Sequence, residues 1–287
     1  MKVTTAVIFT AGFGSRMLPV TASFQKDLLP ILDRPVVDYV VADCLAAGVT
    51  NVIFIVRPGS HGVQNYYSGN PGLMSHLARF GKQKEIDMLN AIHNRANFSY
   101  IEQPDDAGYG TAVPVRAAAS KLPKDEAFIV AGGDGFLWRT DGGSDVADMV
   151  QAFEETSAQA AILAVEAPDD QLYRYGVLGV NEVGGREFLR EFVEKPKPGE
   201  APSNLINTTY WVLTPTLMEY VAQIHKDGSG EYLLTDALLA GAQHHKVVVS
   251  RGHGSWQDAG NVAGWLNANL TVAESKPELA DKFTIYN

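Results

Sequence analysis

Two glycines and two basic residues follow the first apolar run of the chain. Gly12 and Gly14 come soon after Thr5-Ala-Val-Ile-Phe9, and Arg16 and Lys26 follow the glycines. Glycines let a loop turn tightly and lie against a ligand with its N–H groups facing that ligand. Because N–H donors and positive charges gather after one strand, the pattern predicts a polyphosphate-binding loop. An ordinary strand-to-helix turn is the alternative if the glycines are considered alone.

The better-known phosphate loops do not match this segment. The chain has no Gly-x-x-x-x-Gly-Lys-Ser/Thr run of the P-loop type. The dinucleotide fingerprint Gly-x-Gly-x-x-Gly fails at its third glycine, where Met17 stands. The prediction of phosphate binding therefore depends on Arg16, Lys26 and the Leu-Pro steps at 18–19 and 29–30.

Carboxylates follow two other expected strands. Asp134 stands between glycines after the apolar run Ala127-Phe-Ile-Val130, and Asp258 lies in Trp256-Gln-Asp-Ala-Gly260. Mg²⁺ commonly takes one or two protein carboxylates and completes its octahedron with phosphate oxygens and water. The two aspartates are therefore candidate Mg²⁺ ligands. The alternatives are that Asp134 caps a turn and that Asp258 caps the helix expected after it.

Two further segments offer groups for a base and a sugar phosphate. Gln103 has the amide donor and acceptor that the edge of a pyrimidine base requires, and Gly108 permits close approach. Glu194 and Lys195 end another expected strand. Lys195 could hold a phosphate while Glu194 accepts hydrogen bonds from hydroxyl groups. The alternatives are a polar loop at Gln103 and a solvated ion pair at Glu194 and Lys195.

Apolar runs alternate with helix-like stretches along most of the chain. We expect strands at residues 5–9, 52–56, 98–102, 127–131, 159–165, 176–180, 188–193, 206–213 and 246–250. We expect helices at residues 36–48, 72–92, 111–120, 145–156, 215–226, 231–243 and 260–274. This alternation predicts an α/β fold with a Rossmann-like mixed, mostly parallel sheet flanked by helices. Ligands of such sheets bind outside the carboxyl ends of the strands, where Arg16 would lie.

Composition bounds the class of protein. The 287 residues are 46% hydrophobic and 20% charged, which is typical of a globular enzyme. A net charge of −10 argues against a nucleic acid partner, because binding to a phosphate backbone requires a basic face. The single cysteine, Cys44, excludes disulfides within the chain, and we expect it in the core. No signal peptide or apolar run of roughly 18 residues is present, so no membrane association and a cytoplasmic location are expected.

We expect one domain over residues 1–287. Its nucleotide-binding part would span about 1–135, its sugar-phosphate-binding part about 136–260, and its C-terminal helical segment 261–287. The glycine-rich stretch 132–143 is the nearest candidate boundary. Because this stretch lies between an expected strand and an expected helix, we predict that it is a loop of the site.

In their shared order, eight motifs resemble those of the sugar-1-phosphate nucleotidylyltransferases. The motifs span nearly the whole chain: Ala11–Pro19, Lys26–Pro30, Gly108–Val113, Tyr175–Val177, Val193–Pro196, Ala201–Asn204, Leu234–Ala237 and Asp258–Gly260. The expected helical segment Leu73–Ile92 is similar to an insertion in the uridylyltransferase branch, which makes UDP-glucose. The resemblance implies the nucleotide-diphospho-sugar transferase fold, a Mg²⁺ cofactor and a homo-oligomer.

The resemblance also implies a reaction and a set of roles. Glucose 1-phosphate would attack the α-phosphorus of UTP in line, giving UDP-glucose and pyrophosphate. The nucleotide would be bound by Ala11, Gly12, Gly14, Gln103 and Gly108. The triphosphate would be held by Arg16 and Lys26, and Mg²⁺ by Asp134 and Asp258. The sugar phosphate would be received by Gly176, Glu194, Lys195 and the segment around Thr209.

The chain departs from the family pattern at three places. Thr209 stands where family members often have a glycine near the sugar, so the identity of the hexose is open. Gly-Gly-Asp replaces Leu-Pro-Asp at 132–134, and Gln25 replaces a common proline. One alternative is therefore a thymidylyltransferase, or a uridylyltransferase for another hexose 1-phosphate. An alternative from another class is a sugar-nucleotide sensor without catalytic activity.

Overall fold

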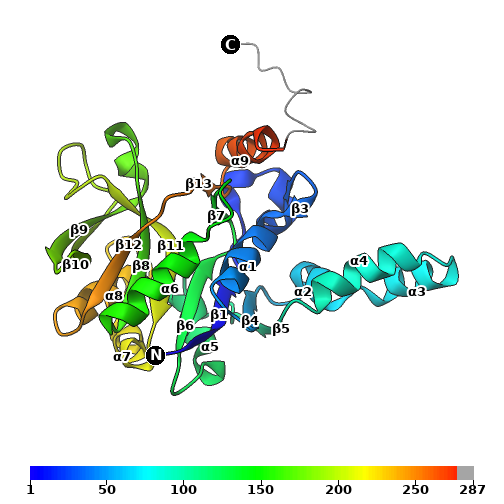
Figure 1. The fold of residues 1–287 in the computed structure, drawn as a ribbon, viewed down its shortest axis with the longest axis horizontal. Coiled ribbons are helices and arrows are strands. Elements are labelled where there is room, and N and C mark those ends of the chain that lie inside the picture. Colours follow the sequence, from blue (N-terminus) through cyan, green and yellow to red (C-terminus); the bar gives the residue numbers. More distant parts are fainter. Residues whose placement is uncertain (277–287) are drawn as a thin grey trace, which may run out of the picture.

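A nine-stranded sheet runs through residues 1–276, the part of the chain that the computed structural model describes (Figure 1). Its order is β5-β4-β1-β6-β11-β8-β12-β10-β9. The strands are β1 (Val3–Phe9), β4 (Asn51–Val56), β5 (Asn97–Glu102), β6 (Ala127–Gly132), β8 (Ala160–Glu166), β9 (Gly176–Val183), β10 (Arg186–Glu194), β11 (Leu205–Leu213) and β12 (Val247–Arg251). Each of these strands was expected from an apolar run, and only their ends differ from the prediction.

The two halves of the sheet differ in strand direction. β5, β4, β1 and β6 are parallel, so their carboxyl ends meet at one edge. β11 runs antiparallel to both β6 and β8, and β9 and β10 form an antiparallel hairpin. β12 is parallel to β8. The expected mixed α/β sheet is confirmed, and most of its parallel pairing lies in the N-terminal half.

Helices cover both faces of the sheet (Figure 1). α1 (Val36–Ala46) and α6 (Asp145–Thr156) pack on one face, and α5 (Ala112–Ala118), α7 (Pro215–Gln223) and α8 (Leu234–Ala242) pack on the other. Neighbouring strand residues point to opposite faces, so Ile8 packs on the first side and Val7 on the second. Cys44 is buried in the first core, as expected.

Three helices between β4 and β5 project from the sheet as an arm (Figure 1). They are α2 (Gly62–Ser68), α3 (Pro71–Arg79) and α4 (Gln83–His93). The prediction of one helix over residues 72–92 is wrong, because the chain turns at Gly81 with a left-handed φ of 65°. Neither α3 nor α4 contains a buried residue, and α4 contacts the core through the half-buried Ile92.

A separate two-stranded sheet lies beside the main one. β7 (Gly135–Trp138) pairs antiparallel with β13 (Ser255–Asp258). The prediction that residues 132–143 are only a loop is therefore wrong over β7. A four-residue strand between glycines is too short to recognise from its apolar pattern. This small sheet matters because it connects the segment after β6 with the C-terminal part of the chain.

The remaining elements are short apart from α9 (Val262–Glu274), which follows β13. The short elements are the hairpin β2 (Pro30–Ile31) and β3 (Arg34–Pro35), and the 3₁₀ helices Ser15–Met17, Val20–Ala22, Lys26–Leu28, Ala119–Lys121 and Asp169–Arg174. The expected helical segment 261–287 is described up to residue 276, and the rest of it lies outside the described residues. Over residues 1–276, no helix combines the length and the apolarity needed to cross a membrane.

Candidate active site

The loop after β1 lies at the carboxyl edge of the parallel strands. The Gln25 amide donates to the Thr10 carbonyl at 2.9 Å, and the Thr21 hydroxyl donates to the Gly14 carbonyl at 2.8 Å. Gly14 has a φ of 67°, a conformation that favours glycine. A methyl group on Gly12 would lie 3.3 Å from the Lys26 side chain. The loop therefore passes directly over Lys26.

Lys26 forms an ion pair with Asp134. Burial of the Lys26 ammonium lowers its pKa, but the carboxylates of Asp134 and Asp27 outweigh burial and raise the pKa above its ordinary value. Burial likewise opposes ionisation of Asp134, yet the ammonium keeps the Asp134 pKa below its ordinary value. Both groups are therefore charged. The structure thus joins two residues that were predicted to bind the triphosphate and the metal separately.

The small β7–β13 sheet brings the two candidate metal ligands together. Asp258 at the end of β13 lies opposite Gly135 in the register of this sheet. The Ala259 N–H donates to the Asp134 carbonyl at 2.9 Å. Two aspartates far apart in the sequence are thereby held on neighbouring backbone segments.

The side chains of Arg16, Asp134 and Asp258 converge at Gly260. A methyl group on Gly260 would lie 2.6 Å from Asp134 Oδ2, 2.9 Å from Arg16 Nη2 and 3.1 Å from Asp258 Oδ1. Asn261, not Asp258, caps α9, because its side chain accepts the Gly264 N–H at 3.0 Å. The Asp258 carboxylate accepts the Gly260 N–H at 3.1 Å and the Asn261 side-chain amide at 3.4 Å, and its Oδ1 lies at the point where the three side chains meet.

Two converging carboxylates suit a hard divalent cation. Within residues 1–276, no group of three or more His, Cys, Asp or Glu side chains could enclose a metal by itself. A cation held between Asp134 and Asp258 would therefore take its other ligands from water and substrate oxygens, as Mg²⁺ commonly does. The residues present fit that group.

Glu194 and Lys195 lie where β10 ends beside the start of β9. Glu194 pairs with Gly176 in the hairpin, and the Lys195 N–H donates to the Tyr175 carbonyl at 3.0 Å. The Lys195 ammonium is 3.5 Å from the Glu194 carboxylate, and the two side chains are 62% and 39% exposed. Partial burial of the Glu194 carboxyl raises its pKa, and the Lys195 ammonium opposes this shift. The pair is solvated in this state and accessible to a ligand.

Thr209 lies at an irregularity in β11, between Asn207 and Trp211. Its φ is 61°, an unusual conformation for a β-branched residue. A methyl group on Gly132 would lie 2.9 Å from the Thr209 hydroxyl oxygen and 3.5 Å from Asp134 Oδ1. Thr209 therefore lies close to the candidate metal ligand Asp134, and its strained backbone lies at the candidate site.

The segment expected to bind the base is at the same edge of the sheet. The Gln103 N–H donates to the Val56 carbonyl at 2.9 Å, which continues the ladder of β5 and β4. Gly108 has a φ of 91°, and a methyl group there would lie 2.9 Å from the Tyr232 ring. Contact of Gln103 and Gly108 with the loop at Ala11 stays a prediction.

Tyr175 lies near both Lys195, a candidate for binding the sugar phosphate, and Asp258, a candidate metal ligand. The sequence analysis assigned it no role. Burial raises the pKa of its phenol, the nearby Asp258 carboxylate raises it further, and Arg16 opposes the shift. Its carbonyl meanwhile accepts the Lys195 N–H. The residue belongs to the motif Tyr175–Val177, so the sequence contained a signal for it.

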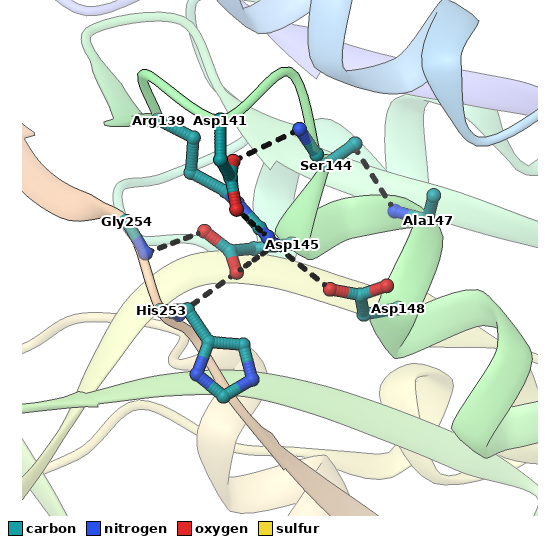
Figure 2. Close-up of polar contacts among 9 residues, drawn as sticks. Arg139, Asp141, Ser144, Asp145, Ala147, Asp148, His253 and Gly254 are labelled. Carbon is teal, nitrogen blue, oxygen red and sulfur yellow. Dashed lines mark hydrogen bonds and ion pairs between the residues drawn. The ribbon is translucent and has the colours of Figure 1, made fainter.

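A second charged cluster holds β13 in place (Figure 2). Asp145, the first residue of α6, is buried and accepts the N–H groups of His253 at 2.8 Å and Gly254 at 2.9 Å. Arg139 donates to Asp145 at 3.1 Å. These contacts connect the β7–α6 loop to the β12–β13 turn, and so they fix the strand that carries Asp258.

Comparison with known protein families gives a match over nearly the whole chain. The family model described as nucleotidyl transferase matches residues 5–275. The chain belongs to the nucleotidyl transferase family.

Relatives of this nucleotidyl transferase share most of its length. The UTP–glucose-1-phosphate uridylyltransferase of Bacillus subtilis is 30% identical over 283 residues, which cover 98% of this chain and 94% of the relative. A Methanocaldococcus jannaschii protein provisionally given the same name is 32% identical over 279 residues, 96% of this chain and 95% of that protein.

Solved structures agree with the fold. The UTP-bound UGPase from Acinetobacter baumannii is 27% identical, has a TM-score of 0.84, and the match covers 98% of this chain and 97% of that one. A UDP-glucose pyrophosphorylase solved with UDP-glucose also has a TM-score of 0.84 at 22% identity. The expected nucleotide-diphospho-sugar transferase fold and the resemblance to this family are confirmed.

Proposed function

We propose that this nucleotidyl transferase transfers UMP from UTP to glucose 1-phosphate, giving UDP-glucose and pyrophosphate. The observation that carries the proposal is the convergence of Arg16, Asp134 and Asp258 on one point, with Lys26 paired to Asp134 beneath the glycine loop. The names of the relatives support the choice of UTP and glucose 1-phosphate.

The two substrates would bind in different parts of the chain. The part over about 1–135 binds UTP, through the loop at Ala11, Gly12 and Gly14 and through Gln103 and Gly108. The part over about 136–260 binds the sugar phosphate through Gly176, Glu194, Lys195 and Thr209. Tyr175 lies between them. This division places the α-phosphorus of UTP near the attacking phosphate of the sugar.

The reaction needs charge neutralisation more than it needs a protein nucleophile. A phosphate oxygen of glucose 1-phosphate forms the new bond to the α-phosphorus, and the bond to the bridging oxygen breaks as pyrophosphate leaves with the electron pair. Arg16 and Lys26 stabilise the negative charge of the triphosphate, and Lys195 aligns the attacking phosphate. Mg²⁺ held by Asp134 and Asp258 would supply further charge neutralisation at the phosphate oxygens.

A matrix of pyrophosphate-release assays with Mg²⁺ tests the proposal. UTP, dTTP, CTP and ATP are each combined with glucose, galactose and mannose 1-phosphates. We expect the highest kcat/KM for UTP with glucose 1-phosphate. Higher activity with dTTP or another hexose would instead identify the alternative transferase. Tight nucleotide binding with no turnover for any pair would identify the sugar-nucleotide sensor.

The proposal includes a homo-oligomer. Leu73, Phe80 and Met88 on the projecting arm are all exposed, and exposed apolar side chains often mark interaction surfaces. Light scattering after size-exclusion chromatography should give a multiple of the mass of one chain. A monomer at all concentrations tested would contradict this part of the proposal. The cytoplasmic location expected from the sequence stays a prediction.

A further inference from the structure

Asp27 is a buried carboxylate with almost no partners. The side chain has no exposed surface, and its Oδ1 has no hydrogen-bond partner among residues 1–276. The Gln25 amide is 3.4 Å from Oδ2, and the Lys26 ammonium is 3.8 Å from Oδ1. A buried, poorly paired carboxylate destabilises a fold. The stability of the protein therefore does not explain why an acid stands here.

The loop that carries Asp134 leaves room for this carboxylate. A methyl group on Gly133 would lie 2.9 Å from Asp27 Oδ1 and 3.1 Å from the Phe9 carbonyl. The same methyl group would lie 2.8 Å from the Thr10 side chain, so a side chain at position 133 would crowd both Thr10 and the Asp27 carboxylate. The missing side chain lets Asp27 reach the Lys26 ammonium while Asp134 binds the same ammonium.

Lys26 therefore lies between two carboxylates but is hydrogen-bonded to one. Asp134 is its close partner, whereas Asp27 lies at a longer distance with an unused oxygen. A divalent cation at Asp134 would compete with the ammonium for the same carboxylate oxygens. Before the triphosphate binds, an ammonium with no second carboxylate would be left by this competition as a buried, unpaired charge, which is strongly unfavourable.

We propose that Asp27 is a positioning residue that receives the Lys26 ammonium when a divalent cation engages Asp134. This proposal rests on the proposed function, because it requires Asp134 to be a metal ligand. Asp27 is the fixed counter-ion, and Asp134 exchanges its lysine for the cation. The ammonium then has a carboxylate partner in both states and stays beneath the glycine loop.

Asp27→Asn tests the exchange by removing the charge with little change in shape. UTP affinity is measured by calorimetry with and without Mg²⁺, since two ligands that assist each other's binding show a coupling. We expect the gain in UTP affinity on adding Mg²⁺ to fall by about fivefold or more. UTP affinity without Mg²⁺ should change by less than about twofold. The Mg²⁺ concentration for half-maximal turnover should rise in parallel.

Asp43→Asn is the matched control. Asp43 is also a buried acid in the N-terminal half, but its carboxylate accepts from Tyr210 and has no ion pair with Lys26. We expect the Mg²⁺ coupling of this variant to stay within about twofold of the wild-type value. Equal losses of coupling in both variants would overturn the proposal, because loss of any buried acid would then have the same effect.

Asp27→Ser removes the same charge with a smaller polar side chain, so it serves if Asp27→Asn does not fold. We expect it to lower the Mg²⁺ coupling in the same direction. Normal coupling in Asp27→Asn with only reduced thermal stability would overturn the proposal and leave Asp27 a structural residue. Absence of Mg²⁺ coupling in the wild-type protein would instead overturn the metal site of the proposed function, and this proposal with it.

Discussion

In the Arg139 cluster, both carboxylate oxygens of Asp141 and of Asp145 have a donor (Figure 2). In the cluster of Lys26, Asp27 and Asp134 (the Lys26 cluster), Asp27 Oδ1 has no donor among residues 1–276. Arg139 binds Asp141 through two parallel hydrogen bonds of 2.6 and 2.8 Å. Lys26 has one close carboxylate and one distant carboxylate. Both clusters adjoin the small β7–β13 sheet.

The two clusters therefore differ in their roles. The charges of the Arg139 cluster stabilise the fold, and those of the Lys26 cluster are available to a ligand. A guanidinium has a planar fork that fixes several acceptors, whereas an ammonium is a compact charge on a flexible stem. The Arg139 cluster is complete without a ligand and fixes β13. The Lys26 cluster can exchange partners. Four substitutions test this comparison, from the largest expected effect to the smallest.

Asp145→Ala should destabilise the protein by about 3 kcal/mol, because it removes the acceptor of the His253 and Gly254 N–H groups and the one buried carboxylate among the three that bind Arg139. Urea unfolding measures the loss. The control is Asp148→Ala, which removes a 48% exposed carboxylate from the same arginine and should cost less than about 1 kcal/mol. Similar losses of unfolding free energy in the two variants would contradict this prediction, because the buried Asp145 carboxylate would then stabilise the fold no more than the exposed Asp148 carboxylate.

Arg16→Ala should remove about 3 kcal/mol of transition-state stabilisation while leaving the unfolding free energy unchanged. Arg16 is exposed and has no salt bridge within residues 1–276, so the fold does not depend on it. Steady-state turnover measures the effect, with Arg79→Ala on the arm as control. A loss of less than about fivefold, roughly 1 kcal/mol, would contradict the role of Arg16.

Asp43→Asn should stabilise the protein by about 2 kcal/mol at pH 8 and by progressively less toward pH 4. Burial raises the pKa of Asp43 to about 7 from an ordinary value of 3.8, although Tyr210 donates to the carboxylate. The folded protein therefore binds an extra proton between these pH values, and the ionised acid destabilises it above pH 7. Urea unfolding at pH 8, 6 and 4 tests this. A stabilisation independent of pH would contradict the assignment.

Thr209→Gly should raise the unfolding free energy by about 1 kcal/mol, because glycine adopts the left-handed backbone without strain. Discrimination between glucose 1-phosphate and other hexose 1-phosphates should fall by about tenfold as the hydroxyl is lost. Ser157→Gly is the matched control, since Ser157 has a φ of 51° at the end of α6. The control should gain stability with unchanged discrimination. If both variants lost the same discrimination between hexose 1-phosphates, the result would contradict a role for Thr209 in binding the sugar.

The centre of the main sheet could be predicted because β1, β4, β6, β8 and β11 are largely buried on both faces and read as continuous apolar runs. The turn within the arm was missed, although Gly81 and the polar residues 82–85 interrupt the apolar spacing over residues 72–92. A glycine inside a helical pattern is only mildly unfavourable, so the sequence does not show whether the helix ends there. β7 was missed because its pairing partner, β13, lies far along the chain.

The candidate site could be predicted where a residue follows a parallel strand, as at Arg16 and Asp134, because such strands share one carboxyl edge. Asp27 and Tyr175 were not assigned roles. Asp27 is adjacent to Lys26, but its burial depends on the missing side chain at Gly133. The position of Tyr175 depends on β9 reaching the N-terminal loop, which only the tertiary fold determines.

The pairing of β7 with β13 has a consequence for biosynthesis. A chain growing from its N-terminus carries the glycine loop, Lys26 and Asp134 long before Asp258 is made. β12 and β13 come after every other strand, so β8 keeps an unpaired edge until they arrive. A nascent chain can therefore order its nucleotide loop early but acquires both carboxylates only once β13 has been made. Premature termination before β13 would yield a protein with the first half of the site and no catalytic activity.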